Sequence, residues 1–397
     1  MEASVNPPFL MKAWELDPTA HQYDDSVTQL IHAERQAPVQ LGADRSLRAK
    51  VIDACGMTCT FCHNEGTPVA ADERSTGVRM NASSLSGRVS VFAVTNGVNF
   101  IPGSMLADES FRGSLRSLHS RLDLNELHLT GGEPTLNKHL PDIVRVATQE
   151  GYSVKMTSNG ENGARIIPSL ASAGLVKVNF SIFGTTPEEL ASVQHEKFRD
   201  TARAARKIQA LHRSIASAVE NGVGVSANVV VPNDSHFERL DRILAEFEPR
   251  LELRLLPDLE AGSDSYFAIY KYLSDRQAIP TMSTIEAGSS NARVHYELPE
   301  GRTVTFKQIR PARLPDTCST CQFNNNEDCK EGYYGIRLYV DDGGTYRVGV
   351  CIQRMDITAT IEEFLVSSLA DEVKLYKEQE YNNLIDVNKR SSDDEKY

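Results

Sequence analysis

The sequence predicts an α/β protein, a partial (β/α)6 TIM-type barrel with a smaller C-terminal domain. Short apolar runs alternate with helical patterns from residue 46 to residue 257, and the alternation then fades. Such alternation implies a parallel sheet with helical crossovers. The six units are fewer than the eight of a closed barrel, so we expect an open one. The expected strands are 46–53, 126–130, 153–157, 176–182, 223–231 and 251–256, and the expected helices are 105–121, 138–150, 162–173, 199–220 and 235–247.

The other segments divide the chain further. Residues 1–45 show no strong periodicity and are expected to form an extension ahead of the barrel at 46–257. The segment 63–104 is rich in Gly, Ser and Asn and follows the first strand, so we expect it to shape a substrate cavity. Residues 258–360 combine short strand patterns with cysteines and predict a separate small domain. Residues 361–397 predict a helix and then a disordered tail.

Composition excludes several classes of protein. The 397 residues are 40% hydrophobic and 24% charged, enough for a large core. Lys and Arg number 42 against 54 Asp and Glu, a net charge of −12, so no general basic surface exists to hold nucleic acid. No apolar run reaches the roughly 18–20 residues of a membrane-spanning helix, and the N-terminus has no basic leader. We expect a soluble cytoplasmic protein with no nucleic-acid or membrane partner.

The seven cysteines fall into two groups, separated by more than 250 residues without cysteine. An odd number cannot pair completely within one chain. Clustered thiolates that bind metal in a reducing compartment fit this distribution better than a disulfide framework. The groups are Cys55, Cys59 and Cys62, and Cys318, Cys321, Cys329 and Cys351.

The first group lies in one loop, CGMTCTFC, directly after the first predicted strand. Three thiolates at this spacing can bind three irons of a [4Fe–4S] cluster and leave the fourth iron without a protein ligand. A structural zinc site that uses the adjacent His63 is an alternative, although a histidine directly after Cys62 would be cramped. Three incidental cysteines are the remaining alternative.

These features resemble the radical S-adenosylmethionine (SAM) superfamily. Cys55, Cys59 and Cys62 match that family's cluster ligands, and Phe61 matches its usual aromatic residue before the third cysteine. The GGEP segment after the second strand matches the family segment whose backbone and carboxylate meet the amino group of SAM. Glycines permit close backbone approach and a carboxylate complements an ammonium, but a turn capped by glutamate would explain GGEP equally well. The segment consists of Gly131, Gly132, Glu133 and Pro134.

More of the chain is similar to one branch, the GTP cyclases that begin molybdenum-cofactor synthesis. The matching blocks are RSLRAKVIDACGMTCTFCHNEG, HLTGGEPTL, MTSNG, VNFSIFG and SANVVVPND, in that order. The resemblance implies that Ser158, Asn159, Ser181 and Asn228, at successive strand ends, line the SAM pocket. Each could instead be an ordinary polar residue at the end of a strand.

The second group resembles the auxiliary-cluster domain of the same branch. Cys318, Cys321 and Cys351 match the three cysteines that hold an auxiliary [4Fe–4S] cluster there, and Cys329 is additional. With four ligands the cluster would relay electrons or stabilise the fold, whereas with three it could bind substrate. We expect four. A four-cysteine zinc site is the alternative, because CxxC is also a zinc signature.

Two arginines bear on whether the substrate of this protein is GTP, as it is for the cyclases. Arg48 and Arg337 resemble arginines that the cyclases use on the nucleotide triphosphate, but Gly335 occupies a third such position. The Gly-Gly tail of that family is replaced by SSDDEKY. Because a triphosphate requires several convergent cations, we expect these arginines to bind a different substrate.

The resemblance implies an oxygen-sensitive biosynthetic enzyme that cleaves SAM reductively to a 5′-deoxyadenosyl radical and removes a hydrogen atom from its substrate. We expect a small molecule (a nucleotide, sugar or specialised metabolite) and a one-electron donor such as flavodoxin or ferredoxin. Maturation of a ribosomal peptide is the alternative, although residues 1–45 are short for a peptide-recognition module. A non-enzymatic zinc protein is the third hypothesis. Tyr333 and Tyr334 are weak candidates for quenching the substrate radical, and packing explains them better.

Overall fold

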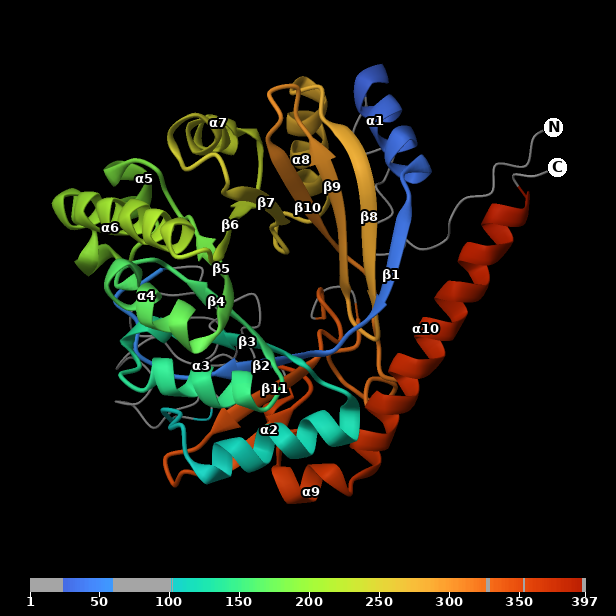
Figure 1. Cartoon of the computed structure of the whole chain (residues 1–397). Helices are drawn as coiled ribbons and strands as arrows, with labels where there is room; N and C mark the ends of the chain where they lie inside the picture. Colours follow the sequence, from blue (N-terminus) through green and yellow to red (C-terminus); the bar gives the residue numbers. More distant parts are fainter. Residues whose placement is uncertain (1–23, 60–100, 102, 326–328, 353, 395–397) are drawn as a thin grey trace.

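The computed structural model describes residues 24–59, 101, 103–325, 329–352 and 354–394, with side chains described as far as Asp386. The described strands form one curved sheet of 13 strands (Figure 1). Their order across the sheet is β1-β8-β9-β10-β7-β6-β5-β4-β3-β2-β11-β12-β13. The predicted segment 63–104 lies outside the described residues, apart from 101, 103 and 104.

Six neighbouring strands pair in parallel in chain order, which confirms the predicted partial barrel. Each overlaps one of the strands expected from the sequence. They are β2 (Ser46–Lys50), β3 (Glu126–Thr130), β4 (Ser153–Ser158), β5 (Leu175–Ser181), β6 (Gly224–Val231) and β7 (Glu252–Pro257).

The five predicted crossover helices are also present, and they cover the outer face of the sheet (Figure 1). Asp108 and Asp200 begin two of them by accepting backbone hydrogen bonds as N-caps. The crossover helices are α2 (Glu109–Leu122), α3 (Leu140–Gln149), α4 (Gly163–Ala173), α6 (Thr201–Glu220) and α7 (Phe237–Glu246). The sequence analysis did not expect α5 (Pro187–Ser192) or the 3₁₀ turns η3 (Pro134–Leu136), η4 (Glu196–Phe198), η5 (Asp234–His236) and η6 (Met355–Ile357).

Side chains alternate between the two faces of each barrel strand. On β3, Leu127 and Leu129 are buried in the same apolar core as Phe111 of α2. His128 and Thr130 point the other way and line a cavity inside the barrel. The helices therefore cover the apolar face, and the polar face is left for chemistry.

Strands after residue 257 continue the same sheet. β10 (Thr303–Ile309) pairs in parallel with β7, and β11 (Ile336–Val340) pairs in parallel with β2, one at each side of the six strands. The two parts of the chain thus share backbone hydrogen bonds, and the division into domains at this point stays a prediction. The other elements here are α8 (Ser263–Asp275), β8 (Ile279–Ala287), β9 (Asn291–Glu297), β12 (Tyr346–Gly349) and β13 (Ala359–Thr360).

The described residues nearest both ends of the chain form more regular structure than the sequence suggested. The expected extension contains α1 (Asp25–Gln36) and β1 (Val39–Ala43), and β1 pairs in parallel with β8. At the other end, α9 (Ile361–Leu365) precedes α10 (Ser368–Asp394). The helix α10 continues through residues 386–394, where disorder was expected, because no Gly or Pro interrupts it there. No helix among the described residues is long and apolar enough to cross a membrane.

A buried carboxylate fastens α1 to the sheet. Glu34 is 4% exposed, and it accepts hydrogen bonds from the hydroxyls of Tyr270 at 3.2 Å and Tyr296, and from Gln308 Nε2 at 2.7 Å. Burial raises the pKa of Glu34. The three donors belong to α8, β9 and β10, so one side chain joins four elements.

Replacing this carboxylate tests its contribution to stability. Glu34→Ala should lower the free energy of unfolding by about 2–4 kcal/mol, because three buried donors lose their acceptor. Urea unfolding checks this, with Glu220→Ala, at the end of α6, as the control. An equal loss in both variants would contradict the anchoring role.

Candidate active site

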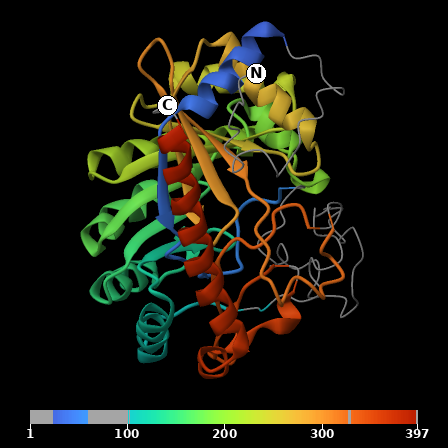
Figure 2. The same ribbon diagram turned by 90° about the vertical axis from the view of Figure 1, so that its right-hand side faces the viewer.

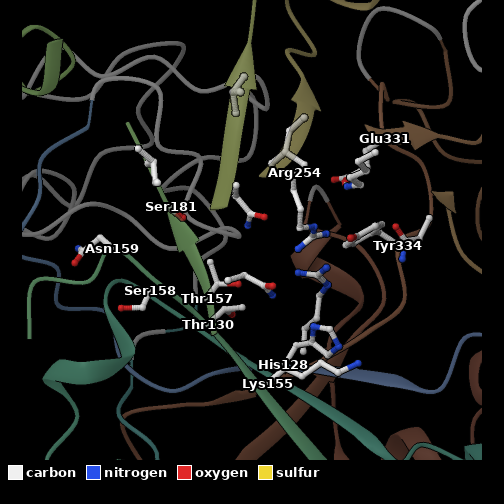
Figure 3. A pocket seen from close by; sticks show the side chains of 18 of the residues that line it. His128, Thr130, Lys155, Thr157, Ser158, Asn159, Ser181, Arg254, Glu331 and Tyr334 are labelled. Atoms are coloured by element: carbon white, nitrogen blue, oxygen red, sulfur yellow. The ribbon is translucent and has the colours of Figure 1, made fainter. Parts of the chain in front are cut away.

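The barrel encloses a cavity of about 800 Å³. Figure 3 shows side chains from several strands pointing into it, with Ser158, Asn159 and Ser181 on one side and Arg254 and Tyr334 on the other. Because parallel strands end at the same edge of a sheet, their C-terminal residues meet here. The cavity therefore has the position of the active site in barrel enzymes.

Two cysteines of the first group line this cavity, in the loop after β2. Polar hydrogens point at both sulfurs: Asn159 Nδ2 lies 3.6 Å from Cys55 Sγ, and Gln194 Nε2 lies 3.5 Å from Cys59 Sγ. Donors of this kind stabilise thiolates, the form in which cysteine binds metal. The third expected ligand, Cys62, and Phe61 lie outside the described residues.

The cysteine loop is held from two sides. Glu161, after β4, accepts a hydrogen bond from the backbone N–H of Gly56 at 2.9 Å. Gln194, after α5, accepts one from the backbone N–H of Thr58 at 2.8 Å. These bonds fix the orientation of the loop.

The GGEP segment packs against the same loop. The N–H of Gly132 donates to the carbonyl of Ile52, and the N–H of Glu133 donates to the carbonyl of Ala54, both at 2.8 Å. A Cβ atom on Gly132 would lie 2.2 Å from that Ala54 oxygen, so only glycine permits this approach. The glycines therefore bring two strand-end loops together.

Glu133 ties the GGEP segment to the end of β4. Its carboxylate is 1% exposed and accepts hydrogen bonds from the hydroxyls of Thr135 and Ser158, and from the backbone N–H groups of Thr135 and Asn159, at 2.6–3.1 Å. Burial raises the pKa of Glu133. Protein donors thus occupy both carboxylate oxygens, and contact with the amino group of SAM stays a prediction.

The other expected SAM-pocket residues converge. Seven of the eight described candidates line the cavity, whereas Pro134 is buried at the start of η3 and is not among the lining residues. The Oδ1 atom of Asn228 is buried and has no partner among the described residues, which suits a site that takes a polar ligand. The seven are Gly131, Gly132, Glu133, Ser158, Asn159, Ser181 and Asn228.

A row of basic side chains crosses the cavity wall on five adjacent strands. Strand register places Arg337 beside Arg48, Arg48 beside His128, His128 beside Lys155, and Lys155 beside Lys177. All five line the cavity. We call them the basic row. The sequence analysis named only its two arginines, although His128, Lys155 and Lys177 also occupy the polar positions of their strands.

Acidic neighbours balance part of the basic row. Glu126 bonds to His128 Nε2 at 3.3 Å and to Lys155 Nζ at 2.5 Å, and these contacts lower the pKa of Glu126 to about 2. Lys177 pairs with Glu252 at 2.7 Å. The Nε atom of Arg337 is buried without a partner in the described structure.

Tyr334 stands among cations in the same cavity. The Arg48 guanidinium lies 4.1 Å and Lys307 Nζ 4.2 Å from the centre of its ring. Burial opposes ionisation of the phenol, but the charges of Arg48 and Lys307 outweigh it and lower the pKa of Tyr334. The neighbouring Tyr333 is buried in the core. The two tyrosines thus differ: Tyr334 faces the cavity and Tyr333 packs.

The second cysteine group lies close together in the fold. Burial, followed by the charges of Cys329 and Cys351, raises the pKa of Cys318 to about 11. Burial also raises the pKa of Cys329, to which Cys351 and Cys321 contribute. Cys318 and Cys329 therefore both lie near other cysteines of the group. In the part of the chain that is described, no three His, Cys, Asp or Glu side chains are gathered as ligands of one metal ion.

Comparison with known proteins identifies the class. Residues 50–244 match the family model of the radical SAM superfamily. This segment contains the cysteine loop, the GGEP segment and strands β3 to β6 of the partial barrel, and the chain is an enzyme of the radical SAM class. Membership implies a [4Fe–4S] cluster and SAM.

Among curated proteins, the chain is similar to two called probable GTP 3′,8-cyclase. The one from Thermoplasma volcanium is 24% identical over 321 residues, which are 78% of this chain and 81% of the relative. The one from Metallosphaera sedula is 26% identical over 306 residues, or 75% and 81%. Among solved structures, Streptococcus suis SuiB has a TM-score of 0.44 and 13% identity over 86% of this chain and 67% of SuiB. That structural likeness is too low to assign a function.

The Glu133 contacts make a testable prediction. Glu133→Ala should weaken SAM binding by at least about tenfold, because Ser158 and the Asn159 N–H lose the acceptor that orders the end of β4. Equilibrium dialysis with SAM and an iron assay measure this on anaerobically purified protein. Glu189→Ala, a half-buried carboxylate outside the cavity, is the control. Unchanged affinity in Glu133→Ala would contradict the positioning role.

Proposed function

We propose that this radical SAM enzyme acts on an anionic small molecule bound in the barrel cavity. Cys55, Cys59 and Cys62 would hold the [4Fe–4S] cluster, and the polar strand ends beside them would hold SAM. When bound, this pair supplies one-electron cleavage of SAM and a carbon-centred radical that removes hydrogen from a substrate. The observation that carries the proposal is one cavity lined by both the cysteine thiols and the basic row.

The charges of the cavity support the anionic substrate class. Lys155 and Lys177 have acidic partners, whereas Arg254 makes no hydrogen bond or ion pair within the described residues. Burial lowers the pKa of Arg254, and the nearby Arg293 adds to this. A guanidinium that faces the cavity without a hydrogen-bonded acidic partner gains strongly from an anionic ligand. A phosphate or carboxylate on the substrate would supply that charge.

A substrate other than GTP is favoured by the corner around Gly335. This glycine has a φ of +100°, and a Cβ there would lie 3.2 Å from Oδ2 of Asp44. Asp44 is 2% exposed, lines the cavity and has a pKa that burial raises to about 6. At this position the cyclases described above have an arginine. This chain has Gly335 there, with the acidic side chain of Asp44 beside it. Repulsion from the Asp44 carboxylate would weaken a triphosphate there.

The second cysteine group would hold an auxiliary [4Fe–4S] cluster. Cys318, Cys321, Cys329 and Cys351 could ligate every iron, which would make that cluster an electron relay or a structural element. Their effect on one another's pKa supports a shared site.

Cysteine variants test the first cluster. Cys55→Ala and Cys59→Ala should each abolish formation of 5′-deoxyadenosine from SAM under dithionite, because the cluster loses a ligand. Chromatography of the quenched reaction measures the product. Cys329→Ala is the comparison, since it should retain the first cluster and its ultraviolet–visible absorbance. Formation of 5′-deoxyadenosine by Cys55→Ala would contradict the assignment of Cys55 as a ligand of the first cluster.

Isotope transfer tests the substrate class. Deuterated candidates are supplied in pairs, with and without a phosphate group, and GTP is included. We expect deuterium in 5′-deoxyadenosine from a phosphorylated compound, none from its unphosphorylated partner and none from GTP. Arg48→Ala should raise KM by at least about tenfold for that compound, because a charge-assisted contact is lost. Equal transfer from both members of a pair would contradict the anionic class.

A further inference from the structure

The cysteine loop has an inner and an outer side. Cys55, Met57 and Cys59 line the cavity, whereas the alternate residues Gly56 and Thr58 line a separate small depression beside α5 and α6. A molecule that covers this depression would therefore be separated from the thiols by the thickness of one loop.

Two basic residues of α6, Arg203 and Lys207, line the depression, and two more lie further along the same helix. Arg203, Arg206, Lys207 and Arg213 follow i, i+3, i+4 and i+10 spacing, which puts them on one stripe of the helix. Arg203 Nη2 and Lys207 Nζ donate to the carbonyl of Gly56 at 3.3 and 3.0 Å. We call these four residues the α6 stripe. Two of them thus contact the backbone between the first two cysteines.

The charge of this surface is opposite to that of the chain. Between residues 195 and 213 there are six lysines and arginines against two acids, although the whole chain has a net charge of −12. Arg206 and Arg213 are exposed and have no ion pair within the described residues. Phe198 is 45% exposed and also lines the depression. Aromatic residues and arginines are enriched in protein–protein interfaces, and a positively charged surface attracts a negatively charged partner.

We propose that the α6 stripe and Phe198 dock an acidic one-electron donor protein that carries a flavin or an iron–sulfur centre. This inference rests on the proposed function, because an electron must reach the cluster held at Cys55, Cys59 and Cys62. One electron passes from the donor's cofactor to that cluster, so the donor is oxidised and the cluster reduced, and no atom is transferred. Because only the cysteine loop separates the two sides, an electron that enters from the side of the depression would travel a short distance to the cluster.

Charge reversal tests the docking surface. The variant Arg206→Glu with Arg213→Glu alters only exposed side chains that do not touch the cysteine loop. With reduced flavodoxin as donor, its KM for flavodoxin should rise at least about tenfold, because two attractions become repulsions. With dithionite, which needs no docking, the rate of SAM cleavage should equal that of the unmodified enzyme.

The matched control carries Arg145→Glu with Lys374→Glu, which reverses two exposed charges on α3 and α10, away from α6 (Figure 1). Its KM for flavodoxin should change less than twofold, and added salt should raise the KM of the unmodified enzyme.

Equal KM values in both variants would overturn the proposal. Failure of both flavodoxin and ferredoxin to support SAM cleavage, while dithionite supports it, would also overturn the proposal. RNA binding that is lost on charge reversal would overturn it as well. No SAM cleavage with dithionite would instead refute the proposed function and, with it, this docking role.

Discussion

The polar interior of the barrel depends on the register of its parallel strands. Because side chains alternate, a shift of one residue would exchange Arg48 and His128 for Leu47 and Leu127. Charged groups would then enter the core beneath the helices, at a cost of several kcal/mol each. The apolar core therefore enforces the register, and the register in turn aligns the basic row. Packing on one face of the sheet determines the chemistry of the other.

The barrel could be predicted because its signals are local. Each of the six strands is a short apolar run next to a helical pattern. The strands at the sides of the sheet could not be predicted in the same way. The parallel pairings of β10 with β7 and of β11 with β2 join segments that are far apart in sequence, and no short-range pattern records them. The order of α1 likewise depends on Glu34 meeting partners more than 200 residues away.

The candidate site was predictable where a motif carries the chemistry. CGMTCTFC and GGEP pointed to their loops, and the fold brings Cys55 and Cys59 of one and the Gly-Gly-Glu of the other to one cavity. Lys155 and Lys177 were missed because a single lysine in a strand resembles any surface lysine until the register is known. The burial of Glu133 was also not foreseen, since its hydrogen bonds come from residues that only the fold brings near. Tyr334 was interpreted as packing, because its two cationic neighbours come from β2 and β10.

The contacts of α10 bear on the order in which the molecule can be assembled. This helix lies along the edge of the sheet beside β1 (Figure 2), and Glu380 pairs with Arg310 while accepting a hydrogen bond from the N–H of Gly288. Every strand in the described part of the chain is synthesised before α10, yet the edge strand β1 stays uncovered until that helix packs against β1 and β8. An unprotected edge strand invites pairing with other chains. A nascent chain would therefore expose the edge strand β1 until α10 has been synthesised.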